Sequence, residues 1–308
     1  MKFKKPNFWK DINLISILLL PFSLVTVLFN SFKSFLITGS KFNIPIICVG
    51  NIYIGGTGKT PLSVNIYNML KKKRYKPAIV RKYYSSHFDE IYLTRNKVKQ
   101  FFSDKKRKLS ISKAIKKKNN VIVMDDGFQD LSIKKNFNII CFNSLDLVGN
   151  GLLLPAGPLR DKLKKIKDCQ MVVINGKRNI GFEKKLKLIS NNIKIYQSIY
   201  ELKKIKKYKR KKLLAFAGIG SPENFFNLLK SYKLNVKDKI SFPDHYNYTK
   251  NEIKRIILRA KKKNLKPVTT EKDYFRIKKF GIKSIDYVPV NLKINKYKSF
   301  KQEILKNL

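Results

Sequence analysis

The stretch that most constrains this chain is an apolar run followed by a glycine-rich turn and a segment with helical spacing. Residues 44–49 are apolar enough to form a buried strand, and the helical pattern continues to about residue 70. The turn and the two residues that follow it are Gly55, Gly56, Thr57, Gly58, Lys59 and Thr60. A turn of this kind at a helix N-terminus directs backbone N–H groups and positive potential at phosphate oxygens. The stretch therefore predicts a nucleotide-phosphate site in a P-loop-type, three-layer α/β/α domain.

The spacing departs from the usual phosphate loop, because Tyr53 stands where a glycine is expected five residues before Gly58. The alternative is an ordinary glycine turn between a strand and a helix. The strand, the Lys-Thr pair and the helix together favour the phosphate loop, in which Lys59 meets the β- and γ-phosphates and Thr60 meets Mg²⁺. We therefore expect ATP and Mg²⁺ as cofactors.

A pair of carboxylates, Asp125 and Asp126, follows a second short apolar run at residues 121–124. Carboxylates at the carboxyl end of a buried strand hold Mg²⁺ in phosphate-loop enzymes, although an isolated Asp-Asp pair is more often a turn. With the phosphate loop upstream, the sequence favours a metal site made of Thr60, Asp125 and Asp126. Arg160, which ends a loop rich in glycine and proline, is either a phosphate contact or part of a turn.

The N-terminal stretch from residue 12 to residue 32 contains no charged side chain. As a helix it would be roughly 30 Å long, about one hydrocarbon core, and Pro21 would kink it. It is a membrane span, a kinked helix in the interface, a buried core helix or a signal peptide, and we favour membrane attachment. Because an ATP site follows directly, we expect the rest of the chain to face the cytoplasm.

The charge balance of the chain is extreme, with 68 Lys and Arg against 20 Asp and Glu in 308 residues, a formal net charge of +48. Attraction to an anionic membrane surface, attraction to nucleic acid and compositional drift each explain such a balance. The lysines are dispersed, with few of the interleaved aromatic residues that stack on single strands. We therefore expect a membrane surface, and no nucleic acid, among the partners.

The pattern along the chain indicates three parts. We expect residues 1–37 to form the membrane-anchoring helix, residues 38–205 the P-loop domain, and residues 206–308 a smaller C-terminal α/β domain. The boundary falls where the apolar pattern weakens between residues 183 and 212 and lysines accumulate. The smaller domain opens with another strand, glycine turn and helix, but it lacks the Lys-Thr pair and by itself is weak evidence for phosphate binding.

Together these segments resemble a known family, the tetraacyldisaccharide 4′-kinases, which are the lipid A 4′-kinases of Gram-negative bacteria. The resemblance covers nearly the whole chain and rests on motifs in a fixed order. After the apolar N-terminal helix these are VGNIYIGGTGKTP, FDE, MDDGFQD, GNGLLLPAGPLR, FAGIGSPENFF, FPDHY and TTEKD. The resemblance implies an enzyme of the inner membrane, on its cytoplasmic face, that transfers the γ-phosphoryl group of ATP, with Mg²⁺, to the 4′-hydroxyl of an acylated disaccharide 1-phosphate lipid.

The resemblance also assigns roles to single residues. Lys59 and Thr60 match the phosphate and metal positions, and Asp125 and Asp126 match the acidic pair near the metal. Asp89 in FDE and His245 in FPDHY match the aspartate and histidine thought to act together on the acceptor hydroxyl. A histidine oriented by a carboxylate removes an alcohol proton near neutral pH, so this pairing is chemically reasonable.

The chain departs from the family at several positions. Asp130 stands where the family usually has a histidine, Phe88 where it has a glycine, and Asp161 where it has a glutamate. The alternative function is a membrane-tethered P-loop NTPase, or a phosphotransferase with a different, non-lipid acceptor.

Overall fold

The computed structural model describes residues 5–85 and 88–308, without the side chains of residues 33, 34, 88 and 89. The chain forms two compact units. The large unit comprises Lys5–Ser85, Thr94–Ile199 and Leu292–Leu308, and the small unit comprises Tyr200–Asn291 together with the segment that ends at Leu93. The expected division into parts at residues 37 and 205 stays a prediction, although Leu292–Leu308 group with the large unit.

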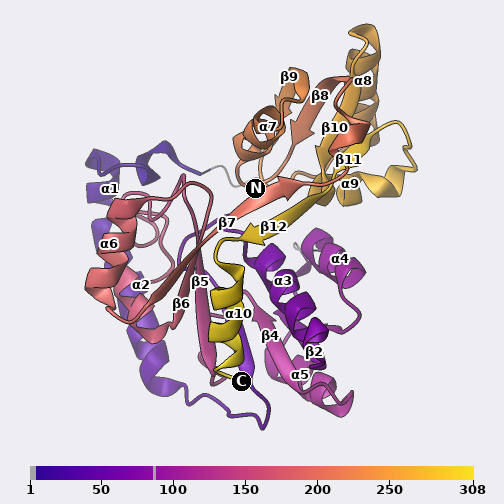
Figure 1. The fold of residues 1–308 in the computed structure, drawn as a ribbon. Coiled ribbons are helices and arrows are strands. Elements are labelled where there is room, and N and C mark those ends of the chain that lie inside the picture. The colour runs from indigo at the N-terminus through magenta and orange to yellow at the C-terminus, as the bar shows by residue number, and fades with distance from the viewer. Residues whose placement is uncertain (1–4, 86–87) are drawn as a thin grey trace. The chain divides into compact units, whose positions relative to one another are not determined.

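The large unit is built on an eight-stranded sheet in the order β12-β7-β6-β5-β1-β4-β2-β3 (Figure 1). The pairings from β7 across to β3 are all parallel. The strands are β1 (Ile46–Gly50), β2 (Pro77–Lys82), β3 (Phe101–Asp104), β4 (Val121–Asp125), β5 (Phe137–Asn143), β6 (Met171–Asn175), β7 (Lys194–Leu202) and β12 (Val290–Ile294). Because parallel strands end at the same edge, β1, β2 and β4 bring their carboxyl ends together.

Helices connect these strands, as parallel pairing requires. Those of the large unit are α1 (Leu14–Leu18), α2 (Leu20–Leu36), α3 (Lys59–Lys72), α5 (Arg107–Lys116), α6 (Ile180–Ile189) and α10 (Tyr297–Leu305), and α4 (Phe88–Lys97) begins in the small unit. Helix α3 lies against β1, β2 and β4. The predicted α/β class is therefore confirmed.

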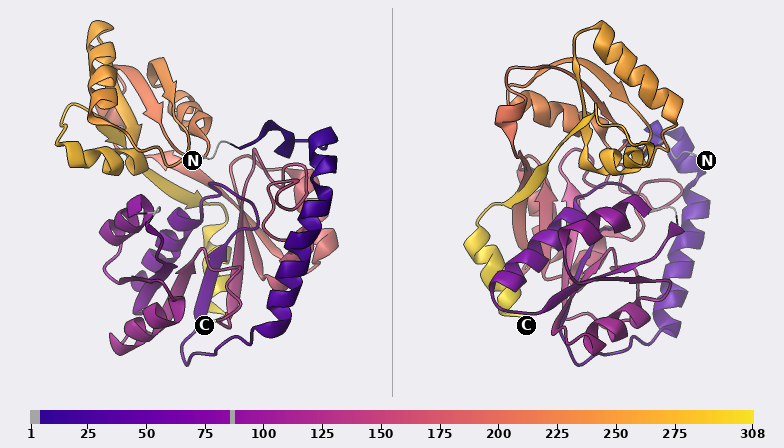
Figure 2. Two further views of the ribbon diagram at one scale, coloured as in Figure 1. Left: turned by 180° about the vertical axis from the view of Figure 1, so that it is seen from behind. Right: turned by 90° about the vertical axis from the view of Figure 1, so that its right-hand side faces the viewer.

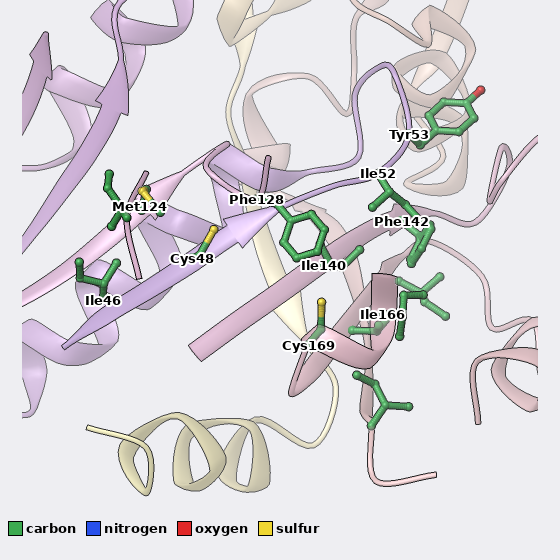
Figure 3. Close-up of a cluster of buried hydrophobic side chains, with 14 of the residues drawn as sticks. Ile46, Cys48, Ile52, Tyr53, Met124, Phe128, Ile140, Phe142, Ile166 and Cys169 are labelled. Atoms are coloured by element: carbon green, nitrogen blue, oxygen red, sulfur yellow. The ribbon is translucent and has the colours of Figure 1, made fainter. Parts of the chain in front are cut away.

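The core of the large unit is continuous from β1 to the far strands of the sheet. Figure 3 shows three side chains of this core close together: Cys48 of β1, Phe128 of the turn after β4, and Ile140 of β5. Gly50, at the end of β1, is required there because a Cβ atom would lie 2.4 Å from the Cβ of Phe128. This close approach sets the path of the chain as it leaves β1 toward the glycine-rich turn.

The small unit contains a four-stranded parallel sheet in the order β11-β10-β8-β9. Its elements are β8 (Lys212–Ala217), α7 (Pro222–Ser231), β9 (Asn235–Ser241), α8 (Lys250–Lys262), β10 (Lys266–Thr270), α9 (Glu271–Ile277) and β11 (Asp286–Val288). Alternate residues of β8 point to opposite faces. Leu213 and Ala215 pack with α7, whereas Leu214 and Phe216 pack with α8.

The N-terminal apolar stretch forms two helices, so the expectation of one helix kinked at Pro21 is wrong. Helix α1 ends at Leu18, α2 begins at Leu20, and Pro21 occupies the first turn of α2, where its missing N–H leaves no hydrogen bond unmade. Figure 2 shows α2 as a long helix at the side of the large unit. Among residues 5–85 and 88–308, no helix is both long and apolar enough to cross a membrane.

The small unit depends on one buried carboxylate, that of Asp273 in the first turn of α9. Its oxygens accept hydrogen bonds from the Gly218 N–H at 3.0 Å and the Tyr248 hydroxyl at 3.1 Å, and Arg276 lies 2.8 Å away. Thr270 caps the same helix by accepting the Asp273 N–H. The motifs FAGIGSPENFF and TTEKD, far apart in sequence, therefore meet at this carboxylate.

We predict that Asp273→Ala lowers the free energy of unfolding by about 3–5 kcal/mol, because it leaves the buried Arg276 without its carboxylate. Urea unfolding followed by circular dichroism measures the change. Lys207→Ala is the control, since it removes a half-exposed ion pair with Asp286 and should change stability by less than about 1 kcal/mol. Equal losses in the two variants would contradict the central role of Asp273.

Candidate active site

The glycine-rich turn has the geometry of an anion site at the start of α3. It spans residues 51–58 between the end of β1 and Lys59. Gly55 and Gly58 have φ of 130° and 89°, which glycine tolerates and other residues rarely adopt, and a Cβ at Gly56 would meet no atom within 4 Å. The first N–H groups of a helix have no partner within it, so they face the turn as donors. Among the described residues, the buried Thr57 hydroxyl also has no partner.

The Asp125 carboxylate is fully buried at the end of β4 and is held by three side chains. Oδ2 accepts from Thr60 at 2.9 Å and from Arg81 at 2.8 Å, while Oδ1 accepts from Ser63 at 3.1 Å. Arg81 also donates to the Thr60 hydroxyl at 3.0 Å. Two of the three predicted metal ligands, Thr60 and Asp125, are therefore in direct contact.

Sequence reasoning left Arg81 and Ser63 out of this group, although the sequence carries a signal for Ser63. Ser63 lies three residues after Thr60 in α3, which places the two side chains on one helix face. Arg81 lies at the end of β2, directly opposite Asp125 in the parallel register. That register follows from the strand order, which the sequence pattern does not reveal.

Asp126 lies just beyond β4 with a left-handed φ of 53° and is half-buried. Lys59 Nζ is 3.6 Å from its Oδ1, and Arg160 is 3.3 Å from the same atom. Burial by itself raises the pKa of Asp126, but surrounding cations outweigh that effect and hold the pKa below its usual value. In order of influence these cations are Lys59, Arg160, Arg81 and Arg107. Asp126 is thus a carboxylate kept ionised by neighbouring positive charge.

Arg160 is oriented by two amides from other segments. Its guanidinium donates to Asn51 Oδ1 at 2.6 Å and to Gln129 Oε1 at 3.3 Å. Gln129 in turn donates to the Asn51 carbonyl at 2.8 Å and to Asp161 at 2.9 Å. The amide contacts were not predicted. They place the Arg160 guanidinium beside Asp126 and Lys59, so the sequence-based interpretation of Arg160 as a phosphate contact fits its surroundings.

A second group of ionisable side chains lies in the small unit. Lys272 Nζ is 2.8 Å from Glu90 Oε1 and 3.1 Å from His245 Nε2, and Glu90 Oε1 is 3.8 Å from the same His245 nitrogen. The predicted partner of His245, Asp89, has its side chain outside the described residues. Sequence reasoning missed Glu90 and Lys272, which belong to the motifs FDE and TTEKD.

Known proteins resemble this chain over its full length. A sequence model of the family described as tetraacyldisaccharide-1-P 4′-kinase matches residues 15–100 and 88–308. The tetraacyldisaccharide 4′-kinase of Pelagibacter ubique (strain HTCC1062) is 39% identical over 315 residues, covering 99% of this chain and 98% of the relative. The corresponding protein of Rickettsia canadensis (strain McKiel) is 33% identical, with coverage of 99% and 98%.

The chain belongs to the tetraacyldisaccharide-1-P 4′-kinase family. The resemblance predicted from the motifs is therefore confirmed. A solved structure supports the fold of this family member: the "apo" form of LpxK from Aquifex aeolicus in complex with ATP has a TM-score of 0.73 and 22% sequence identity. The match covers 96% of this chain and 99% of the other.

The family departure at Asp130 has a structural explanation. Asp130 accepts from Arg107 at 2.9 Å and from the Ser132 hydroxyl at 2.6 Å. Arg107 also donates to the backbone carbonyl of Asp126. A carboxylate at this position therefore holds a buried arginine against the backbone of the acidic pair.

The residues present suit a divalent cation of the Mg²⁺ type. Such an ion prefers carboxylate and hydroxyl oxygens, which Thr60, Asp125 and Asp126 supply. The set contains only two carboxylates, and nowhere among the described residues do three or more His, Cys, Asp or Glu side chains gather as a metal site. Lys59 and Arg81 neutralise the two carboxylates, so charge balance at the strand ends is already maintained.

The lowered pKa of Asp126 predicts how stability depends on pH. The unfolded carboxyl group binds a proton near its ordinary pKa of 3.8, whereas the folded one binds it only at lower pH. Its contribution to stability is therefore complete above that value and is lost as pH falls through the folded pKa. We expect the stability difference between wild type and Asp126→Asn to shrink between about pH 5 and about pH 2.

Urea unfolding at a series of pH values measures this difference. Asp168→Asn is the control, because it removes a carboxylate whose side chain is 57% exposed. A difference for Asp126→Asn that stays constant over the acid range would show that the cations around it do not lower its pKa.

Proposed function

We propose that this protein transfers the γ-phosphoryl group of ATP to the 4′-hydroxyl of a tetraacyldisaccharide 1-phosphate, a step of lipid A biosynthesis. The observation that carries this proposal is a phosphate-binding turn joined to an acidic pair, Thr60 to Asp125 and Lys59 to Asp126, in a chain of this family. The relatives are named tetraacyldisaccharide 4′-kinases, and the similar Aquifex protein is described in complex with ATP. The large unit then serves as the P-loop-type, three-layer kinase domain.

The phosphate side of the reaction follows from the charges in the large unit. The N-terminus of α3 and the residues Gly55, Gly56, Thr57 and Gly58 receive the phosphate oxygens. Lys59 and Arg160 then stabilise negative charge on the group being transferred. Mg²⁺ held by Thr60, Asp125 and Asp126 would neutralise charge on the β- and γ-phosphates.

The acceptor side requires a group that takes the proton of the attacking hydroxyl. His245, together with Asp89, is the proposed base. Lys272 lies 3.1 Å and Glu90 3.8 Å from His245 Nε2, so charged side chains of the motifs TTEKD and FDE surround the proposed base.

A lipid acceptor is favoured over a soluble one by the surface of α2. Its exposed apolar side chains include Phe22, Leu28, Phe29, Phe32 and Phe35, with exposed fractions between 61% and 88%. A shallow hollow lies among several of them. A contiguous apolar surface of this kind is typical of a site that contacts other molecules or a membrane.

We further propose that α2 lies in the interface of the inner membrane on the cytoplasmic face. The apolar side chains of α2 enter the lipid, and the net charge of +48 adds attraction to anionic headgroups. This placement keeps the catalytic residues beside an acceptor that is itself dissolved in the bilayer. Because ATP is supplied from the cytoplasm, the protein must lie on the cytoplasmic face of the membrane.

The assay for the proposed function is transfer of labelled phosphate from ATP to a tetraacyldisaccharide 1-phosphate by the purified protein. We expect a bis-phosphorylated lipid as product. Lys59→Ala should lower kcat/KM by about 100- to 1,000-fold, because it removes a charge that stabilises the transition state. His245→Ala should lower kcat by about 100- to 10,000-fold while ATP still binds.

No lipid product from the wild-type protein, with ATP hydrolysed nonetheless, would favour an NTPase or a non-lipid acceptor. Near-normal transfer by Lys59→Ala would contradict the phosphate-loop assignment. Near-normal kcat for both His245→Ala and Asp89→Ala would exclude the proposed base.

Membrane attachment through α2 is tested by sedimentation with anionic lipid vesicles. Phe22→Glu and Phe29→Glu should each weaken vesicle binding about tenfold or more, because a buried phenylalanine contributes about 1.5–3 kcal/mol. Leu188→Glu is the matched control, an 89% exposed apolar residue in α6 that should leave binding unchanged. Equal binding by all three variants would show that other surfaces hold the protein on the membrane.

A further inference from the structure

Helix α2 turns polar side chains toward its own unit and apolar ones toward the outside. Among the residues of α2 whose side chains the structure describes, the buried and half-buried ones are Ser23, Thr26, Val27 and Asn30, which recur at helical spacing along one face. A surface helix ordinarily places its apolar face inward, so α2 is inverted. Membrane contact explains the apolar face, but it does not explain why three polar residues occupy the inner one.

The three polar side chains all donate to backbone carbonyls of the loop between residues 149 and 160. The bonds run from Ser23 to Leu153 at 2.9 Å, from Thr26 to Leu154 at 2.8 Å and from Asn30 to Arg160 at 3.1 Å. Ser23 also accepts the Ala156 N–H at 3.2 Å. The carbonyls of this loop lack the partners that a strand or helix would supply, and side chains of α2 provide the hydrogen bonds instead.

The backbone of Arg160 is held by a hydrogen bond at its N–H and another at its carbonyl. Its N–H donates to the Ile52 carbonyl of the phosphate-loop segment at 2.7 Å, while its carbonyl accepts from Asn30. Its guanidinium then reaches Asn51 and Asp126. The backbone of Arg160 is therefore fixed between α2 and the phosphate loop, and this fixes the point from which the guanidinium extends.

We infer that Asn30, supported by Thr26 and Ser23, is a positioning residue that sets the place of the Arg160 guanidinium at the phosphate site. The inference rests on the proposed function, in which Arg160 stabilises the transferred group. A catalytic charge must be held within a fraction of an ångström to be effective, and a displaced guanidinium loses much of its effect. The helix that contacts the lipid therefore also completes the phosphate site.

The physical basis is the carbonyl that Asn30 satisfies. In Asn30→Asp the shape of the side chain is kept, but its donor becomes a negative acceptor facing the Arg160 carbonyl. The two oxygens repel, so the Arg160 backbone moves away from α2. Thr26→Val is a milder change of the same kind, because it removes the donor to the Leu154 carbonyl without changing the side-chain volume much.

The test is a double-mutant cycle on the affinity for a non-hydrolysable ATP analogue, which needs no lipid acceptor. We expect Asn30→Asp to weaken binding about fivefold and Thr26→Val about twofold in the wild-type background. In an Arg160→Ala background neither change should weaken binding further. Asn138→Asp is the matched control, since Asn138 also donates its amide to a carbonyl, that of Asp168 at 2.9 Å, and it should have no effect in either background.

Kinase kinetics supply a second measurement. Asn30→Asp should lower kcat about tenfold, with KM for ATP raised no more than about fivefold and a thermal midpoint close to that of Asn138→Asp. The inference is overturned if the binding loss persists in the Arg160→Ala background, or if both α2 variants bind and turn over like the wild type. Absence of lipid phosphorylation by the wild type would remove the proposed function, while the binding cycle would still decide the role of Asn30.

Discussion

The phosphate site depends on one fully buried carboxylate, that of Asp125, which must be paired and hydrogen-bonded. A buried charge is tolerated only when opposite charge and hydrogen bonds surround it. Arg81 supplies the charge, and Thr60 and Ser63 supply the bonds. Because these partners come from β2 and α3, satisfying one carboxylate fixes the start of α3 against the ends of two strands.

Opposite charges also surround the second carboxylate of the pair, that of Asp126. Its charge is balanced by Lys59 from α3 and by Arg160 from a loop that follows β5. Arg107 supports the backbone of Asp126 and is itself held by Asp130. The site is therefore a layer of alternating charges at the strand ends, and the geometry of each residue follows from the need to pair its neighbour.

Helix α2 links this layer to the surface of the protein. Its outer face is apolar, and its inner face supplies donors to the loop that carries Arg160. The sequence alone suggested only the first property, since residues 12–32 lack charge. Nothing in the sequence distinguishes Ser23, Thr26 and Asn30 from other polar residues in an apolar run. Their role follows from the backbone carbonyls to which they donate.

The sequence by itself determined those parts of the protein that depend only on neighbouring residues along the chain. The strand, glycine turn and Lys-Thr pair predict an α/β fold and the place of Lys59, because left-handed backbone and helix N-termini have short-range signatures. Only the tertiary structure decided that Arg81 lies opposite Asp125 and that Glu90 and Lys272 lie beside His245. It also decided that α2 donates hydrogen bonds to a loop about 130 residues away. Those pairings depend on strand order and on contacts between distant segments, and no spacing within a single stretch of sequence encodes them.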